Sequence, residues 1–243
     1  MQHRELPAGW DRHLPSFPAD PTGLAGREAS GKVLNVLAQN VPWLLGGSAD
    51  LGPSNKTILT YEGAGSFQPD TPGGKNLHYG IREHAMGAVV NGLSLSKLRG
   101  YGSTFFIFSD YARPAIRLSA LMELPTIFIF THDAMGDGED GPTHQPVEHL
   151  ASLRAIPGLV TFRPGDANEV VEAYRYIMQL RHKPAVLALS RQPLPTLDRS
   201  NYASAAGVAK GAYVLADTPA KNPEVILIAS AVKSVLPCKR TRS

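Results

Sequence analysis

The segment Thr126–His149, TIFIFTHDAMGDGEDGPTHQPVEH, contains a short apolar run followed at once by a long polar loop. The run Ile127–Phe130 has the length and composition of a strand buried on both faces of a sheet. The loop behind it carries three histidines and five acidic residues among glycines and prolines. In an open α/β sheet, ligands bind beyond the carboxyl ends of the strands, on loops of this kind. The segment therefore predicts a buried strand with a ligand site at its end.

Apolar runs and helical patterns alternate on both sides of this segment. Such alternation predicts an α/β fold, with a parallel sheet and helices on both faces. Asp166 is expected to cap one helix, and Pro114 is expected in the first turn of another. The expected strands are 43–45, 76–79, 101–106, 126–130, 159–162 and 185–189, and the expected helices are 27–39, 83–98, 110–122, 147–154 and 167–180.

The two ends of the chain differ from this central α/β domain, which we assign to residues 27–205. Residues 1–26 are rich in proline and glycine and predict an extended linker arm. Residues 206–243 contain two strand-like runs, 211–216 and 225–230, and then a basic tail. Since one starting strand cannot bury itself, these residues are interpreted as the truncated start of a further domain.

Composition excludes several classes of protein. The chain has 24 Lys and Arg against 21 Asp and Glu, and four of the basic residues lie in the last twelve. Without those four the net charge is −1, so nucleic-acid binding gains no support. No apolar run approaches the roughly 20 residues of a membrane helix, and the N-terminus has no signal-peptide core. The single cysteine, Cys238, excludes an internal disulfide, and a cytoplasmic location is expected.

The polar loop admits several interpretations. Gly136-x-Gly138-x-x-Gly141 matches a dinucleotide fingerprint in form only, because acids surround it and Pro142 stands where the helix should begin. A metal site would draw on His132, Asp133, Asp140 and His144, but their spacing fits no standard zinc pattern. Binding of substrate hydroxyls and phosphate is the better use of these groups, and a solvated acidic loop remains the alternative.

Other candidate residues lie at expected strand ends. Glu83 stands at a strand-to-helix junction, where an acid either favours a helix N-terminus or takes part in proton transfer. Phe105, Phe108 and Tyr111 either belong to the core or form a stacking wall for a flat ring. Arg27, Ser54 and Arg191 are scattered, and spacing alone marks them as ordinary surface residues.

Six motifs, in this order and spacing, closely resemble the central, pyrimidine-binding domain of transketolase. The resemblance covers about residues 5–230, and the segment GEDGPTHQPVEH favours transketolase over related thiamine enzymes. It implies the thiamine-diphosphate-binding fold of pyrimidine domains. The motifs are LGGSADLGPSN (45–55), HYGIREHAMG (78–87), GSTFFIFSDYAR (102–113), THDAMGDGEDGPTHQPVEHLASLR (131–154), FRPGDANEV (162–170) and ALSRQ (188–192).

The resemblance assigns roles residue by residue. Glu83 corresponds to the glutamate that hydrogen-bonds N1′ of the thiamine diphosphate aminopyrimidine, and the cofactor acts as an electron sink. His144 matches a residue close to the reacting oxygens, and Asp140 matches one that contacts a substrate hydroxyl. The candidate catalytic residues are Glu83, His144 and His132; the cofactor-binding residues are Glu83, Phe105, Phe108, Tyr111 and Asp50; the substrate-binding residues are Arg27, Ser54, His132, Asp140, His144 and Arg191.

The resemblance also implies partners. The family's N-terminal domain, which holds the magnesium-bound diphosphate, has no counterpart in these motifs, so no metal ligand is expected in this chain. Thiamine diphosphate, with magnesium or calcium, would require a partner domain or subunit that supplies this function. The implied activity is transfer of a two-carbon ketol unit between sugar phosphates, and a homodimer is expected. The alternatives are a non-catalytic dimerising fragment and an enzyme similar to dihydroxyacetone synthase.

Overall fold

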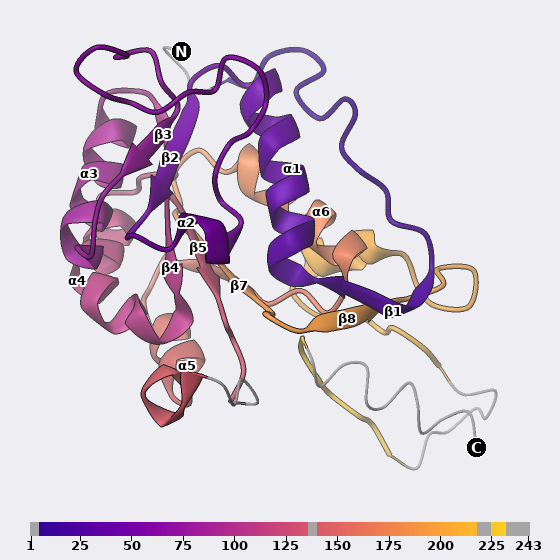
Figure 1. The fold of residues 1–243 in the computed structure, drawn as a ribbon. Helices are drawn as coiled ribbons and strands as arrows, with labels where there is room; N and C mark the ends of the chain where they lie inside the picture. Colours follow the sequence, from indigo (N-terminus) through magenta and orange to yellow (C-terminus); the bar gives the residue numbers. More distant parts are fainter. Residues whose placement is uncertain (1–4, 136–139, 218–224, 232–243) are drawn as a thin grey trace.

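A six-stranded parallel sheet forms the centre of the molecule (Figure 1). The computed structural model describes residues 5–135, 140–217 and 225–231. The strand order is β3-β2-β4-β5-β7-β6, and β1 pairs antiparallel with β8 in a separate two-stranded sheet. The strands are β1 (Asp20–Ala25), β2 (Leu44–Ser48), β3 (Asn76–His78), β4 (Arg99–Phe105), β5 (Ile127–Thr131), β6 (Val160–Phe162), β7 (Ala185–Leu189) and β8 (Pro193–Thr196).

Strand β5 lies inside the sheet, between β4 and β7, and all of its residues are buried. Ile127 and Ile129 belong to one hydrophobic core, whereas Phe128 and Phe130 belong to another. Successive side chains of a strand point to opposite faces, so a strand covered on both sides needs apolar residues at every position. The buried strand predicted from the apolar run is confirmed.

Helices cover both faces of the sheet, as predicted (Figure 1). Residues of α1 and α6 line the core that contains Ile127 and Ile129, whereas α3, α4 and α5 contribute to the core that contains Phe128 and Phe130. The helices are α1 (Gly26–Asn40), α2 (Gly52–Asn55), α3 (Glu83–Leu95), α4 (Ser109–Leu121), α5 (His149–Arg154) and α6 (Ala167–Gln179).

Local sequence explains how two of the helices begin. The Asp166 carboxylate accepts a hydrogen bond from the Glu169 backbone N–H at 2.8 Å, so the predicted cap of α6 is confirmed. Helix α4 follows a 3-10 turn, Phe106–Phe108, and begins at Ser109. Pro114 therefore lies inside α4, and its placement in the first turn was wrong.

Residues 6–25 and 193–210 lie against the central domain. Residues expected as an extended arm include β1, and Trp10 and Phe17 are partly buried against the core beside α1 and α6. Neither 211–216 nor 225–230 forms a strand, so both strand predictions were wrong. A strand requires a hydrogen-bonded neighbour, and none of the described strands pairs with these runs. The basic residues of the tail, Lys233 to Arg242, and Cys238 lie outside the described residues.

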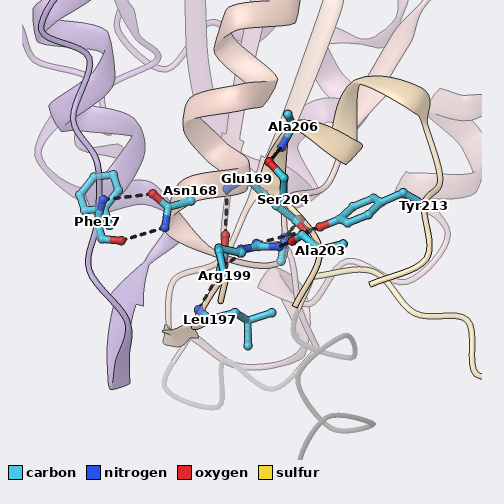
Figure 2. Close-up of polar contacts among 11 residues, drawn as sticks. Phe17, Asn168, Glu169, Leu197, Arg199, Ala203, Ser204, Ala206 and Tyr213 are labelled. Atoms are coloured by element: carbon cyan, nitrogen blue, oxygen red, sulfur yellow. Dashed lines mark hydrogen bonds and ion pairs between the residues drawn. The ribbon is translucent and has the colours of Figure 1, made fainter. Parts of the chain in front are cut away.

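The segment after β8 is attached to the start of α6 by charged and polar contacts (Figure 2). The Arg199 guanidinium donates to the Asp166 carboxylate at 2.6 Å and to the Ala203 carbonyl at 2.8 Å. The Tyr213 hydroxyl donates to the Glu169 carboxylate. On the other side, Asn168 exchanges two hydrogen bonds with the backbone of Phe17. Helix α6 thus joins both ends of the chain to the sheet.

Candidate active site

The predicted site residues gather at the carboxyl edge of the sheet. Glu83 begins α3 after β3, Phe105 ends β4, His132 follows β5, and Arg191 follows β7. Because the central strands are parallel, their carboxyl ends lie at one edge. Residues far apart in sequence are therefore brought to one region of the molecule.

Glu83 is a buried acid at the first position of α3, with 8% of its surface exposed. The hydroxyl of Thr104, on β4, donates to one carboxylate oxygen of Glu83 at 3.3 Å. This is a long hydrogen bond, so the carboxylate keeps accepting capacity for a further donor. Thr104 and Phe105 are the last two residues of β4, so Glu83 and the aromatic residues both lie near the carboxyl end of this strand.

Phe105, Phe108 and Tyr111 form a continuous aromatic group. The rings of Phe105 and Phe108 are stacked, with centroids 6.0 Å apart and planes inclined by 15°. Tyr111 follows at 6.1 Å from Phe108. Phe105 is buried, whereas 64% of the Tyr111 surface is exposed, so the group runs from the core to the surface. Flat apolar surfaces of this kind stack on heterocyclic rings.

Both predicted catalytic histidines contact this aromatic group. The His132 ring lies 3.8 Å from the Phe105 ring between centroids. The His144 ring meets Phe108 edge to face at 5.2 Å and Phe105 at 6.0 Å. Phe105 therefore contacts both histidines, and the preceding residue of β4, Thr104, holds Glu83.

Charged residues surround the buried ring of His132. Its Nε2 lies 3.9 Å from a carboxylate oxygen of Asp140. Burial lowers the pKa of His132 to about 4; the positive charges of Arg27 and Arg191 and the neighbouring His144 also lower this pKa, and Asp140 opposes them. The ring is therefore neutral at pH 7. The same interactions place four other predicted site residues around His132.

Arg27 and Ser54 are brought together from different helices. The Arg27 guanidinium, in the first turn of α1, donates to the Ser54 carbonyl of α2 at 2.9 Å. The start of α1 is also fixed to the end of β7, because the Arg27 backbone N–H donates to the Ser190 carbonyl at 3.2 Å. Arg27 Nε is buried without a hydrogen-bond partner among the described residues. Such a donor suits an anionic ligand.

Asp50 is the predicted residue with the weakest connection to the others. It follows β2, is exposed, and adopts a left-handed backbone conformation with φ of 61°. Within the described ranges it forms no hydrogen bond or ion pair. Its position at the carboxyl edge of the sheet is as expected, but its predicted contact with the cofactor stays a prediction.

The two other interpretations of the polar loop gain no support. Asp133, a member of the considered metal set, is bound by Arg163 at 2.7 Å through its carboxylate and at 2.9 Å through its carbonyl. Gly141 precedes only a short 3-10 turn, Pro142–His144, and no phosphate-binding helix. Gly136 and Gly138 of the dinucleotide-like pattern lie outside the described residues.

A different group of side chains has the geometry to hold a metal ion. Asp110, Glu148 and His149 each offer a ligand atom, and these atoms lie within 4.8 Å of one another. His149 Nε2 already pairs with the Asp110 carboxylate at 3.0 Å, which joins α4 to α5. The group is explained by the hydrogen bond between the two helices, and sequence analysis did not identify it.

Sequence analysis also missed residues that support the site. Thr104 contacts Glu83, Arg163 holds Asp133, and Asn55 and Thr131 form a buried hydrogen bond beside His132. Thr104 and Thr131 share one feature, a buried polar side chain at or next to the last residue of a strand. Buried polar groups need partners, so this feature could have identified Thr104 and Thr131. The long-range partners Asn55 and Arg163 could not be paired with them from spacing.

The fold and the grouped candidate residues define an α/β domain with a candidate ligand site at the carboxyl edge of a parallel sheet. No helix in the described part of the chain combines the length and apolar character needed to span a membrane. The family model described as the pyrimidine-binding domain of transketolase matches residues 22–196. The chain belongs to this transketolase family.

Relatives and solved structures agree on the family. Transketolase of Geobacillus stearothermophilus is 52% identical over 229 residues, which cover 93% of this chain and 34% of the relative. Transketolase of Bacillus subtilis is 51% identical over 227 residues, with coverage of 93% and 34%. The chain therefore spans about a third of the length of these curated relatives.

Two solved structures are informative. A transketolase from Pichia stipitis, solved in complex with sedoheptulose 7-phosphate, has a TM-score of 0.82 at 43% identity and covers 89% of this chain and 33% of that one. A split-gene transketolase, described as an inactive β4 tetramer, has a TM-score of 0.58 at 30% identity and covers 72% of this chain and 54% of that one.

Proposed function

We propose that this chain supplies the pyrimidine-side wall of a transketolase-type site, which transfers a two-carbon ketol unit from a ketose phosphate to an aldose phosphate. The single observation that carries the proposal is the contiguous group of aromatic residues and two histidines, at the same strand end where Thr104 holds the buried Glu83. Relatives about half identical to the chain are named transketolase, which supports the same activity. The proposed domain division keeps this site within residues 27–205.

The residues present fit thiamine diphosphate on the side of its aminopyrimidine. Glu83 offers a buried carboxylate with accepting capacity, which suits the N1′ position of the ring. Phe105, Phe108 and Tyr111 offer aromatic faces for the flat heterocycle. When bound, the cofactor supplies an electron sink for the carbon fragment that is transferred. Glu83 would hold and orient the ring, and the aromatic residues would exclude water from it.

The remaining residues suit a sugar phosphate. Arg27 and Arg191 would bind the phosphate through charged, forked hydrogen bonds, with Ser54 and His132 beside them. Asp140 would accept a hydrogen bond from a substrate hydroxyl. His144, at the outer edge of the aromatic group, would move protons at the reacting oxygens. Asp50 would approach the cofactor from the end of β2.

The complete site requires a partner. A domain or subunit that binds the diphosphate, with magnesium or calcium, would form the opposite wall. The split-gene relative supports this arrangement, since its described tetramer is inactive. Self-association is supported by apolar residues exposed on two neighbouring helices: Val89 and Leu95 of α3, and Tyr111, Leu118 and Leu121 of α4. A cytoplasmic location is part of the same proposal.

The test is reconstitution of activity. The chain is mixed with a separately produced diphosphate-binding domain of a transketolase, thiamine diphosphate and magnesium, and ketol transfer is assayed. Glu83→Gln keeps the size of the side chain but removes the carboxylate, and it should lower kcat at least a hundredfold, within the range of one general acid–base interaction. Glu62→Gln, at an exposed position, is the matched control. Equal activity of the two variants would refute the role of Glu83.

A non-catalytic dimerising module is the second candidate function. It is favoured by the solved split-gene relative, which is described as an inactive β4 tetramer. This candidate predicts no turnover in any mixture and no change in melting temperature on addition of thiamine diphosphate. A third assay, with formaldehyde as the acceptor, distinguishes a dihydroxyacetone-synthase-like activity from ketol transfer between sugars.

A further inference from the structure

The protonation of His132 depends on its hydrogen bond to Thr131. His132 Nδ1 lies 2.9 Å from the Thr131 hydroxyl, and both residues are buried. A neutral imidazole carries one proton, on either Nδ1 or Nε2, and the partner of Nδ1 decides which. A threonine hydroxyl can donate or accept, so this contact alone leaves both forms open. Whether Thr131 donates to His132 or accepts from it is decided by the other hydrogen bonds of Thr131 and of its partner Asn55.

The first hydrogen bond whose direction is certain is the one from the Ser48 hydroxyl to a backbone carbonyl. The Ser103 carbonyl only accepts, and the Ser48 hydroxyl donates to it at 2.9 Å. The single proton of Ser48 is thereby used, so Ser48 must accept from Asn55. The Asn55 amide nitrogen lies 2.9 Å from the Ser48 oxygen, in agreement with this requirement. These three residues are buried, so solvent offers no alternative partner.

The orientation of the Asn55 amide then fixes Thr131. With the nitrogen of Asn55 directed at Ser48, its oxygen faces Thr131 at 2.8 Å. An amide oxygen only accepts, so the Thr131 hydroxyl donates to it and has no proton left for His132. The Thr131 oxygen must therefore accept a proton from His132 Nδ1.

From this chain of donors we infer that Asn55 is a positioning residue, which acts through Thr131 to keep the proton of His132 on Nδ1 and to present Nε2 to the site as a hydrogen-bond acceptor. The competing form, with the proton on Nε2, would need an acceptor on that side. The Asp140 carboxylate is there, but at 3.9 Å it is beyond hydrogen-bond distance. Burial and nearby cations independently lower the pKa of His132 to about 4, so the ring is neutral at pH 7.

The consequence for binding rests on the proposed function, in which His132 contacts the substrate phosphate. A phosphate dianion has only acceptor oxygens, which the lone pair on Nε2 repels. Contact then requires one more proton, on the imidazole or on the phosphate, so binding is coupled to uptake of one proton. The charged or titratable groups around the ring are Arg27 of α1, Asp140 and His144 of the loop after β5, and Arg191 after β7.

The first experiment needs no ligand and no activity. Nitrogen-15 NMR of histidine-labelled full chain at pH 7 identifies which ring nitrogen of His132 carries the proton, with His132→Asn used for assignment. The wild-type chain should show the Nδ1–H form. Thr131→Val, which keeps shape but removes the hydroxyl, should move the proton to Nε2 in most molecules. An Nε2–H ring in the wild type, or no change in Thr131→Val, would overturn the inference.

Thr143→Val is the matched control, because Thr143 makes the same 2.9 Å contact to the Nδ1 of the next histidine, His144, at an exposed position. It should leave the His132 resonances unchanged. Asn55→Ala is a second test of the same point: it removes the acceptor of Thr131, so a folded variant should contain both ring forms.

The second experiment uses the reconstituted enzyme. Above the second pKa of phosphate, about 6, the KM for a phosphorylated acceptor should rise up to tenfold per pH unit. Thr131→Val should flatten this slope, and a non-phosphorylated acceptor should not show it. Equal slopes in wild type and Thr131→Val would contradict the coupling. Complete absence of turnover would count against the proposed function. The role of Asn55 in fixing the proton of His132 would then be judged by the NMR experiment, which needs no activity.

Discussion

Two Thr-His pairs, one at the end of β5 and one in the loop that follows it, have the same sequence but differ in burial and in their other hydrogen-bond partners. In Thr131–His132 and in Thr143–His144 the hydroxyl lies 2.9 Å from Nδ1 of the adjacent ring. The first pair is buried at the end of β5, and Asn55 contacts its hydroxyl from behind. The contact in the second pair is exposed and lies within the 3-10 turn Pro142–His144, where the His144 ring meets Phe108 edge to face.

The difference shows that a local hydrogen bond does not define the state of a histidine. At the exposed pair, the Thr143 hydroxyl can turn and exchange partners with water, so it does not choose between the two ring forms. At the buried pair, each hydroxyl proton has a fixed acceptor: the Thr131 hydroxyl donates to the Asn55 oxygen, and the Ser48 hydroxyl donates to the Ser103 carbonyl. We therefore expect the first histidine to be held in one form and the second to adjust to its ligand.

The largest expected effect concerns the residue after the buried pair. Asp133 has a fully buried carboxylate, which is held by Arg163. Arg163→Met removes the cation and leaves this charge unpaired, and it should lower the free energy of unfolding by about 3–5 kcal/mol. Urea denaturation measures the loss. The exposed Arg154, changed to Met in the same way, should cost less than about 0.5 kcal/mol. Similar values for the two variants would show that the ion pair does not stabilise the buried segment.

The next effect is a dependence of stability on pH. Because the pKa of His132 is lowered from 6.5 to about 4 on folding, the unfolded chain takes up this proton more readily in that range. The free energy of unfolding should therefore fall as the pH decreases from 6.5 towards 4, by roughly 2 kcal/mol between pH 7 and pH 5 for this group. Below about pH 4 both states are protonated and the contribution of His132 is lost.

This pH effect is measured by urea denaturation at several pH values. His132→Asn should flatten the curve by the stated amount, whereas His144→Asn, in the exposed pair, is the comparison. If the two variants change the curve equally, the contrast between the pairs does not extend to their protonation.

The smallest expected effect is the loss of a single hydroxyl. Thr131→Val leaves the buried Asn55 oxygen and the Nδ1 atom of His132 without their partner, and it should cost about 1–2 kcal/mol. Thr143→Val removes a hydroxyl that water can replace, and it should change stability by less than about 0.5 kcal/mol. Thermal melting of the two variants, compared at one pH, measures both. Equal melting temperatures would indicate that the buried bond is no stronger than the exposed one.

Much of the fold could be predicted because its signals are local. The continuous apolar run before His132 predicts a strand with two buried faces, and Asp166 predicts the start of α6; both are confirmed. The errors in the strand predictions have one cause, which is that a strand exists only with a neighbour. Asp20–Ala25 becomes β1 because β8 lies beside it, whereas 225–230, although more apolar, has no described strand beside it and forms none.

For the site, sequence by itself determined the kinds of side chain at the strand ends: the acid at Glu83, the aromatic group, the two histidines and the two arginines. It could not distinguish one Thr-His pair from the other, because both present the same neighbours along the chain. Only the tertiary structure decided that Asn55 accepts a hydrogen bond from the threonine of the first pair. The physical reason is that burial removes water as an alternative partner, so the direction of each hydrogen bond is set by residues remote in sequence.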